Sequence, residues 1–254
     1  MLNGLPSEDA RRLYGDLAWV WPIISPVEEY AQDEELLATA IRENSQIPAK
    51  TLLDIGCGGG HLDYHLKRHF QVTAADISES MLALARELNP EITHHQGDMR
   101  TMRLDRLFDA VLIYDAINYM RTPEELRAAF QTAFAHLKPE GLFLTFAEVT
   151  AESFQQNKTF VRAHSRGDVE LVFIENYYDP DPQDTTYEST FCYLIRQGGK
   201  LTVEMDRHLV GVFPLETWRQ LLKQVGFRVK QRKFKHSDFA PGEPPPLLVC
   251  IKPT

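Results

Sequence analysis

Cysteine is scarce in this chain, and so is any long apolar run. The three cysteines, Cys57, Cys192 and Cys250, lie too far apart in the sequence to form a metal-binding pair or a disulfide framework. No apolar stretch approaches the roughly 20 residues of a membrane-spanning helix. The first apolar stretch follows acidic residues and is broken by Pro22, so we do not expect a signal peptide. These absences favour the cytoplasm and argue against a membrane partner.

Positive charge is also in short supply. The chain has 27 Lys and Arg against 36 Asp and Glu, which gives a formal net charge of −9. A net negative chain lacks the overall attraction that drives binding to nucleic acid. The one basic run, at 228–235 (RVKQRKFK), is better interpreted as the solvent face of a strand near a sheet edge. We therefore expect no nucleic-acid partner.

Short apolar runs alternate with helical patterns through the first part of the chain, which predicts an α/β fold with a doubly wound, largely parallel sheet. One helix is expected to begin after Thr122 and to end just before Gly141. From Asp168 the pattern becomes strand–turn–strand, with a hairpin turn at 197–199. We expect four units: an N-terminal helical cap (1–50), a cofactor-binding core (51–150), an antiparallel lid insert (168–213), and a C-terminal helix with the last two core strands (214–254).

Glycine is concentrated at one place, the turn of the segment LLDIGCGGG (52–60). Gly56, Gly58 and Gly60 follow what reads as a buried strand, and ligands of a doubly wound sheet bind at such strand ends. A dinucleotide fingerprint would need a third glycine at the position of His61, and a phosphate-binding loop would need Gly-Lys-Ser/Thr. The turn therefore predicts a ligand lying against the backbone without a phosphate clamp.

Two acids follow the next two expected strands. Asp76 closes the second strand, where a carboxylate can accept both hydroxyls of a ribose. Asp98 and Met99 follow the third strand, where an acid can accept from an adenine amino group beside an apolar cover. With the glycine turn, these residues predict an adenosine site.

These motifs, together with FDAVLIYDAINY (108–119) and LKPEG (137–141), resemble the class I S-adenosylmethionine-dependent methyltransferases over roughly residues 50–150. The resemblance implies a seven-stranded Rossmann-like sheet and S-adenosyl-L-methionine as cofactor. It implies that Asp54 orients the ammonium group of the cofactor. The other cofactor-binding residues that it implies are Gly56, Cys57, Gly58, Asp76, Ile77, Met81, Asp98, Met99 and Tyr114.

The aromatic N-terminal stretch resembles that of small-molecule N-methyltransferases, of the amino-sugar and, more loosely, glycine types. By that resemblance Tyr14 and Tyr30 approach the cofactor, and Tyr14 also takes part in catalysis. Asp115, Asn118 and Tyr119 would project near the methyl group, the first two as catalytic residues and the third as a substrate contact. The family often has an acid where this chain has Phe146; Glu148, which would share a strand face with that position, is a candidate substrate contact in its place.

The insert carries a further candidate, His208, whose imidazole can accept a proton at neutral pH and could serve as a general base. Its aromatic residues either form the buried face of a small sheet or roof an acceptor pocket, with Tyr178 as a substrate contact. Three histidines at helical spacing (61, 65 and 69) are interpreted as a solvated helix face, and we expect no metal.

The favoured function is methyl transfer to a small-molecule acceptor, with nitrogen preferred over oxygen. An O-methyltransferase remains the alternative within the same chemistry. A non-catalytic adenosyl-cofactor-binding protein and a nicotinamide-dependent reductase are the alternatives from other classes. A homodimer is a further expectation.

Overall fold

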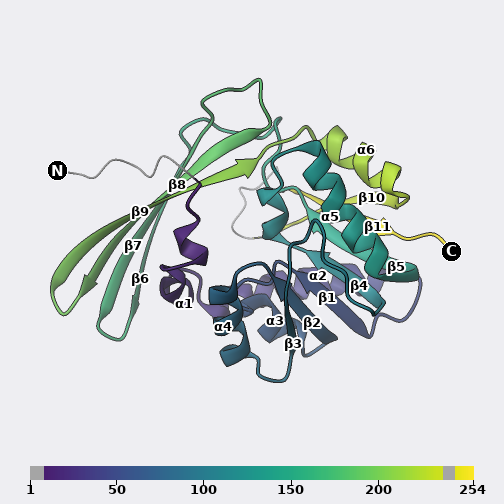
Figure 1. Ribbon diagram of the computed structural model, residues 1–254, viewed down its shortest axis with the longest axis horizontal. Coiled ribbons are helices and arrows are strands. Elements are labelled where there is room, and N and C mark those ends of the chain that lie inside the picture. Colours follow the sequence, from purple (N-terminus) through teal and green to yellow (C-terminus); the bar gives the residue numbers. More distant parts are fainter. Residues whose placement is uncertain (1–8, 237–243) are drawn as a thin grey trace.

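The computed structural model describes residues 9–236 and 244–254. A seven-stranded sheet runs in the order β10-β11-β5-β4-β1-β2-β3 (Figure 1). Its strands are β1 (Thr51–Ile55), β2 (Gln71–Asp76), β3 (Thr93–Gln96), β4 (Phe108–Ile113), β5 (Leu137–Phe146), β10 (Arg228–Lys233) and β11 (Pro246–Ile251). The paired strands from β3 through β5 are parallel, whereas β11 is antiparallel to both β5 and β10. The doubly wound sheet is confirmed, and its last strand, β11, runs opposite to its neighbours.

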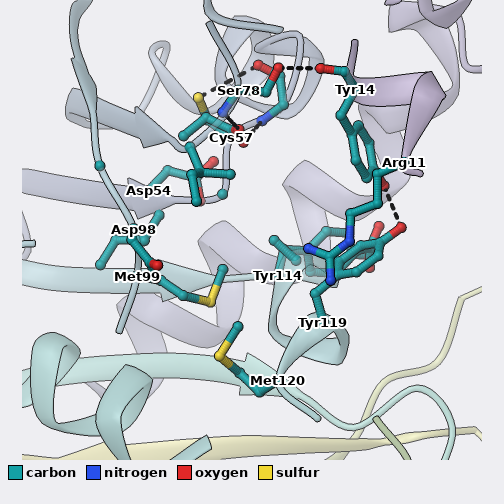
Figure 2. A pocket seen from close by; sticks show the side chains of 18 of the residues that line it. Arg11, Tyr14, Asp54, Cys57, Ser78, Asp98, Met99, Tyr114, Tyr119 and Met120 are labelled. Carbon is teal, nitrogen blue, oxygen red and sulfur yellow. Dashed lines mark hydrogen bonds between the residues drawn. The ribbon is translucent and has the colours of Figure 1, made fainter. Parts of the chain in front are cut away.

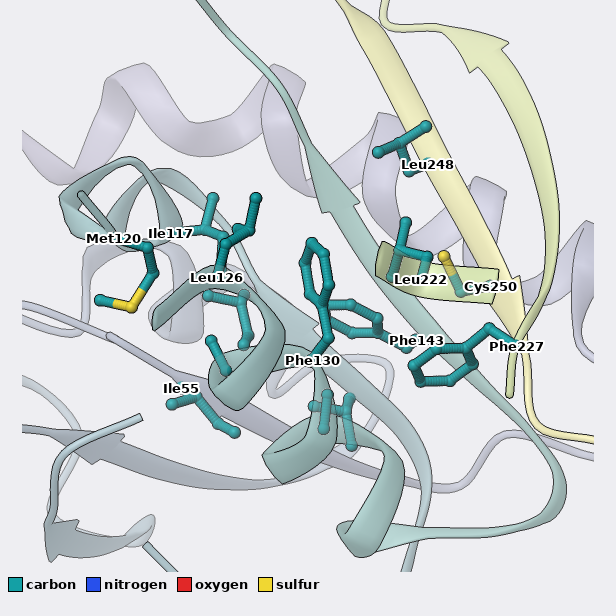
Figure 3. Packing of buried hydrophobic residues seen from close by; sticks show 14 of the residues in the cluster. Ile55, Ile117, Met120, Leu126, Phe130, Phe143, Leu222, Phe227, Leu248 and Cys250 are labelled. Carbon is teal, nitrogen blue, oxygen red and sulfur yellow. The ribbon is translucent and has the colours of Figure 1, made fainter. Parts of the chain in front are cut away.

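Helices cover both faces of this sheet: α2 (Ala31–Asn44), α3 (His61–Leu66), α4 (Glu79–Leu88), α5 (Pro123–His136) and α6 (Leu215–Val225). Every residue of β4 is buried, as expected for a central strand covered on both sides. On one face Phe130 of α5 packs near Phe143 of β5 (Figure 3). The ring of Trp218 on α6 also lies near Phe130. On the other face α2 contributes Leu37 and Ile41.

The helix expected to reach Gly141 ends earlier. Thr122 caps α5 by accepting from the backbone N–H of Glu125, as predicted, but α5 ends at His136 and β5 begins at Leu137. Pro139 explains the difference, because proline lacks the N–H that a helix needs and disfavours helical backbone in the residue before it. The prediction for this segment was wrong by about one helical turn.

A second, antiparallel sheet runs in the order β6-β7-β8-β9, with β6 (Thr159–Arg166), β7 (Val169–Tyr178), β8 (Thr186–Gln197) and β9 (Lys200–Gly211). The hairpin turn at Gly198 and Gly199 is confirmed, and both glycines have positive φ. The sheet begins with β6, before Asp168, and this first strand was not predicted from the sequence. That strand is mostly exposed and shows little alternation, which left no clear periodic signal.

The N-terminal segment (9–30) connects the two sheets. Leu13, Leu17 and Ile23 pack with Phe173 of β7 and Tyr193 of β8 in one buried cluster. In Figure 1 the short helix α1 (Trp21–Ile24) lies beside the second sheet, next to α4 and the main sheet. The segment therefore brings the second sheet toward the carboxyl ends of the main strands.

The three histidines of the first core helix do not form a solvated face. His61 and His65 are each 6% exposed, and their rings hydrogen-bond the backbone oxygens of Ser25 (2.7 Å) and Val27 (2.8 Å). His69, just after α3, contacts Glu34 of α2. The prediction was wrong because the N-terminal segment covers this side of α3, and the spacing of residues within the helix gives no information about such a distant segment. Within the described ranges no cluster of His, Cys, Asp or Glu could hold a metal ion.

Two further observations concern surface elements. The basic strand β10 forms an exposed edge of the main sheet, as predicted. No helix among the described residues is long and apolar enough to span a membrane. The proline-rich stretch at 241–246 lies partly outside the described residues.

Candidate active site

A cavity of about 570 Å³ opens at the carboxyl ends of β1, β2, β3 and β4. Figure 2 shows Asp54, Asp98 and Met99 on one side of it, opposite Tyr14, Arg11 and Tyr119. The predicted residues that line it are Tyr14, Tyr30, Asp54, Gly56, Cys57, Gly58, Asp76, Ile77, Asp98, Met99, Tyr114, Asp115 and Tyr119. Most of the predicted cofactor residues therefore meet in one place.

The glycines after β1 serve different purposes. A Cβ on Gly56 would lie 2.2 Å from the Cβ of Ala116, and a Cβ on Gly60 would lie 2.7 Å from the amide of Asn89. A Cβ on Gly58 would meet nothing closer than the Trp21 ring, at 4.0 Å. Gly56 and Gly60 thus allow close packing of the protein, whereas Gly58, with φ of 54°, leaves open space at the cavity wall.

Asp76 holds the glycine turn in place. Its carboxylate accepts from the backbone N–H of Gly58 (2.9 Å) and of Ser78 (2.8 Å). Its enclosed position raises its pKa, and these N–H donors oppose that rise. Ser78 in turn caps α4 and donates from Oγ to the backbone oxygen of Tyr14 at 2.6 Å. Asp76 therefore shapes the turn and also faces the ligand space.

Asp98 is partly engaged already. Arg100 donates to it from the backbone N–H and from the guanidinium, and these bonds hold the pKa of Asp98 below its usual range. A carboxylate has lone pairs for further donors, so an adenine amino group can still be accepted there. Met99 lines the cavity beside it.

Two polar atoms at the glycine turn lack protein partners among the residues described. Asp54 Oδ1 is a buried acceptor without a donor, and Trp21 Nε1 is a buried donor without an acceptor. Both side chains line the cavity. Burial and the adjacent carboxyl of Asp63 raise the pKa of Asp54. An ammonium group would satisfy Asp54 and a carboxylate would satisfy Trp21, so the site fits the amino-acid end of S-adenosylmethionine.

On the side of the cavity opposite Asp54, a chain of hydrogen bonds runs from Tyr14 into the second sheet. Tyr14 Oη lies 2.9 Å from Tyr119 Oη, and Tyr119 Oη lies 2.6 Å from Nδ1 of His208. The other ring nitrogen of His208 lies 2.7 Å from Oδ2 of Asp206. His208 thus contacts the segment YDAINY (114–119), although it is fully buried and does not line the cavity itself.

Three acidic side chains from different elements gather beside the cavity. Asp115 follows β4, Glu148 follows β5, and Glu175 lies on β7. Burial, followed by the charges of Glu148, Asp33 and Glu175, raises the pKa of Asp115 well above its usual value. Burial and the charge of Glu175 raise the pKa of Glu148 to about 7. The group therefore favours a bound cation or retained protons.

Several predicted site residues lie elsewhere. Met81 is fully buried in the cluster between α4 and the second sheet, because it lies on the inner face of an amphipathic helix. Asn118 does not line the cavity, and Tyr178 is 43% exposed at the end of β7. Glu148 does not share a strand face with Phe146, because β5 ends at Phe146.

The remaining aromatic and sulfur groups have structural roles. Tyr114 lines the cavity, stacks on Phe146 at 4.7 Å and donates its hydroxyl to Asp33 at 2.7 Å. Tyr30 bonds Ser25 Oγ at 2.8 Å. Burial raises the pKa of Cys57 well above its usual value, so its thiol is a poor nucleophile and a space-filling group in the turn.

Sequence reasoning missed several residues of the site. Trp21, Arg11 and Ser78 line the cavity, and Asp206 and Glu175 lie on the second sheet behind it. Period-two alternation could have found the last two, because Asp206 shares a face with His208, and Glu175 with Phe173. Nothing in the local pattern marks Trp21, whose place depends on the fold of the N-terminal segment.

Comparisons with known proteins support the interpretation of the cavity as an S-adenosylmethionine site. Residues 52–141 match the family model described as "Methyltransferase domain". A Streptomyces venezuelae dTDP-3-amino-3,4,6-trideoxy-alpha-D-glucopyranose N,N-dimethyltransferase is 38% identical over 117 residues, which is 45% of this chain and 49% of that protein. The chain thus matches about half the length of that relative.

Two solved structures share the fold over most of their length. The crystal structure of Streptomyces venezuelae DesVI has a TM-score of 0.80 at 26% identity, over 94% of this chain and 96% of that one. SAM-bound CalS10, an amino pentose methyltransferase from Micromonospora echinaspora, has a TM-score of 0.77 at 23% identity, over 88% and 91%. The sheet order, the cavity and these matches agree: residues 52–141 form a methyltransferase domain, and the chain has the fold of S-adenosylmethionine-dependent methyltransferases.

Proposed function

We propose that this methyltransferase adds methyl groups to a nitrogen atom of a small-molecule acceptor, and that the acceptor is an amino sugar. The observation that carries the proposal is the group of three carboxyls, Asp115, Glu148 and Glu175, of which Asp115 lines the cavity and the other two lie close enough to raise its pKa. Their raised pKa values indicate that burial and mutual repulsion outweigh the nearby charges of Lys158 and Arg162, so that a further cation would be favourable there. A protonated amine supplies that cation, whereas a neutral hydroxyl does not.

The second sheet supports a small acceptor. Residues at odd positions along β7 and β8 face one way, and they include Glu175, Tyr177, Tyr187 and Ser189. Ser189 donates to Glu175 at 2.9 Å, and Tyr187 is buried near Glu148 and Glu175. This face provides hydroxyls and carboxylates suited to a polyhydroxylated amine. In this role the second sheet is a lid over the acceptor.

The cofactor supplies one element of the chemistry: when bound, it presents a methyl group on a positively charged sulfur. Asp76 and Asp98 would hold the adenosine part, and Asp54 and Trp21 the amino-acid part. Exclusion of water and orientation of the amine contribute most of the rate, because nitrogen lone pairs are already good nucleophiles. The protein also has to remove a proton from the amine.

The names of the relatives suggest the acceptors to test. The purified chain would be given S-adenosylmethionine with dTDP-3-amino-3,4,6-trideoxy-glucose, which corresponds to the name of a relative, and with the matched sugar carrying a 3-hydroxyl group. We expect turnover of the amine and none of the hydroxyl compound. Turnover of the hydroxyl compound alone would favour the O-methyltransferase alternative. Cofactor binding without turnover of either would favour a non-catalytic binding protein, once a wider amine panel had also failed.

Three expectations about partners and location belong to this proposal. The net charge of −9 supports a protein that does not bind nucleic acid, and the three free cysteines fit the reducing cytoplasm. Val161 of β6 and Leu201 and Val203 of β9 are apolar and exposed, which is compatible with a homodimer. Analytical ultracentrifugation would test the last expectation directly.

A further inference from the structure

The hydrogen-bonded chain from Tyr14 to Asp206 joins an open site to a buried proton acceptor. Tyr14 and Tyr119 line the cavity, whereas His208 and Asp206 are both 0% exposed. The three links measure 2.9, 2.6 and 2.7 Å in order. All are within the normal hydrogen-bond range, so the four side chains form one continuous path.

The chemistry of the inner end fixes which way each hydrogen points. Burial alone would raise the pKa of Asp206, but bonds from His208 and from the backbone N–H of Leu13 hold it below its usual value. A carboxylate only accepts, so Nε2 of His208 carries the hydrogen and Nδ1 presents a lone pair. Tyr119 then donates to Nδ1, and Tyr14 donates to the oxygen of Tyr119. Because Tyr14 lines the cavity and donates its own hydrogen to Tyr119, its oxygen can still accept a proton from a ligand there.

We propose that these four residues, the tyrosine–histidine relay, remove the proton from the acceptor amine. The inference rests on the proposed N-methylation. An N–H bond of the bound ammonium breaks, its electron pair stays on nitrogen, and the proton passes to the oxygen of Tyr14. The Tyr14 hydrogen moves to Tyr119, and the Tyr119 hydrogen moves to Nδ1 of His208. The two tyrosines end neutral, and the imidazolium lies against the Asp206 carboxylate.

The groups around the relay suit this transfer. Glu175 of β7 and Asp206 of β9 place negative charge near His208, and Arg11 lies over the Tyr119 ring at 4.7 Å. Burial raises the pKa of both tyrosines above the usual value, so they remain hydroxyls and pass protons without becoming stable phenolates. The proton returns by the same path once the product has left. Tyr14 meets the acceptor, and Tyr119, His208 and Asp206 are positioning residues that act through it.

The kinetic test compares Tyr119→Phe, His208→Asn and the double variant, each assayed with S-adenosylmethionine and the amino sugar named above. Loss of a general base predicts that kcat falls about tenfold to hundredfold in each. The double variant should be no worse than either single one, because both break the same path. The KM for S-adenosylmethionine should not change, and the acid limb of the wild-type kcat profile against pH should disappear.

A matched control is Tyr193→Phe. Tyr193 is a buried tyrosine on β8 whose hydroxyl has no partner among the described residues, so its loss should leave kcat and the pH profile unchanged. A second readout needs no turnover: nitrogen NMR of the free protein should show His208 with hydrogen on Nε2, and Tyr119→Phe should shift the Nδ1 signal.

The outcomes separate the relay from the proposed function. An active enzyme whose pH profile is unchanged in His208→Asn would overturn the relay alone, and so would hydrogen on Nδ1. Additive losses together with a raised KM for S-adenosylmethionine would mean that these residues only hold the second sheet in place. If no amine is methylated at all, the proposed function fails first and the relay fails with it.

Discussion

Replacing Glu148 with glutamine should make the protein more stable and less active. Burial, followed by the charge of Glu175, raises the pKa of Glu148 from 4.5 to about 7. Between those two pH values the folded protein therefore binds more protons at this site than the unfolded chain does. By linkage, stability falls as pH rises through this window, and the full penalty is present above pH 7.

The size of the effect follows from the shift. One pKa unit corresponds to about 1.4 kcal/mol, so a shift of about 2.5 units costs the folded protein about 3 kcal/mol at high pH. Glutamine has the same shape and no charge. We expect Glu148→Gln to raise the free energy of unfolding by up to about 3 kcal/mol at pH 8 and by almost nothing at pH 4.5.

Urea denaturation of both proteins at the two pH values measures this directly. The control is Glu170→Gln, an exposed glutamate on the same strand as Glu175, which should change stability by less than about 0.5 kcal/mol. The affinity for the amine acceptor should fall in Glu148→Gln, while the affinity for S-adenosylmethionine should not. The reasoning is refuted if the variant is equally stable or less stable than the wild type at pH 8.

Three predictions concern the cofactor. Asp76→Ala should weaken S-adenosylmethionine binding by roughly 1.5–3 kcal/mol in calorimetry, because it removes the ribose acceptor and the two hydrogen bonds that hold the glycine turn. Unchanged affinity in the folded variant would disprove the role of Asp76 in cofactor binding. Gly58→Val should abolish S-adenosylmethionine binding, because the new side chain enters open space at the cavity wall. The control Gly167→Val, which has a similar positive φ in the β6–β7 turn, should bind the cofactor normally. Equal losses in both variants would mean that backbone strain is the cause. Trp21→Phe should reduce affinity for S-adenosylhomocysteine about tenfold or more without changing affinity for methylthioadenosine, which lacks the amino-acid part. The exposed Trp19, changed to Phe, is its control, and equal effects on both ligands would contradict the assignment of Trp21.

The main sheet and the cofactor residues could be predicted because their signals are local. One edge of the parallel sheet can be placed from short segments alone. These are a buried strand followed by glycines, and then Asp76 and Asp98 at the ends of the next two strands. The cap at Ser78 and the hairpin at Gly198 also depend only on neighbouring residues. Such features are set by backbone chemistry that a short sequence window contains.

The acceptor side could not be predicted in the same way, because it depends on contacts between distant segments. Asp206 meets Leu13 and His208 meets Tyr119 only after the second sheet has folded over the N-terminal segment. The buried state of His61 has the same origin, since its partner is the backbone of Ser25. Met81 shows the reverse error: a motif resemblance placed it at the cofactor, whereas the helix turns it into the core.

The most direct test of the account is the position of a transferred methyl label. The protein would be incubated with S-adenosylmethionine carrying a deuterated methyl group and with the 3-amino sugar, and the product analysed by tandem mass spectrometry and NMR. The account predicts that the label appears on the sugar nitrogen, with one S-adenosylhomocysteine released for each methyl group gained. Label on a hydroxyl oxygen, or no S-adenosylhomocysteine above the level without acceptor across the amine panel, would contradict it.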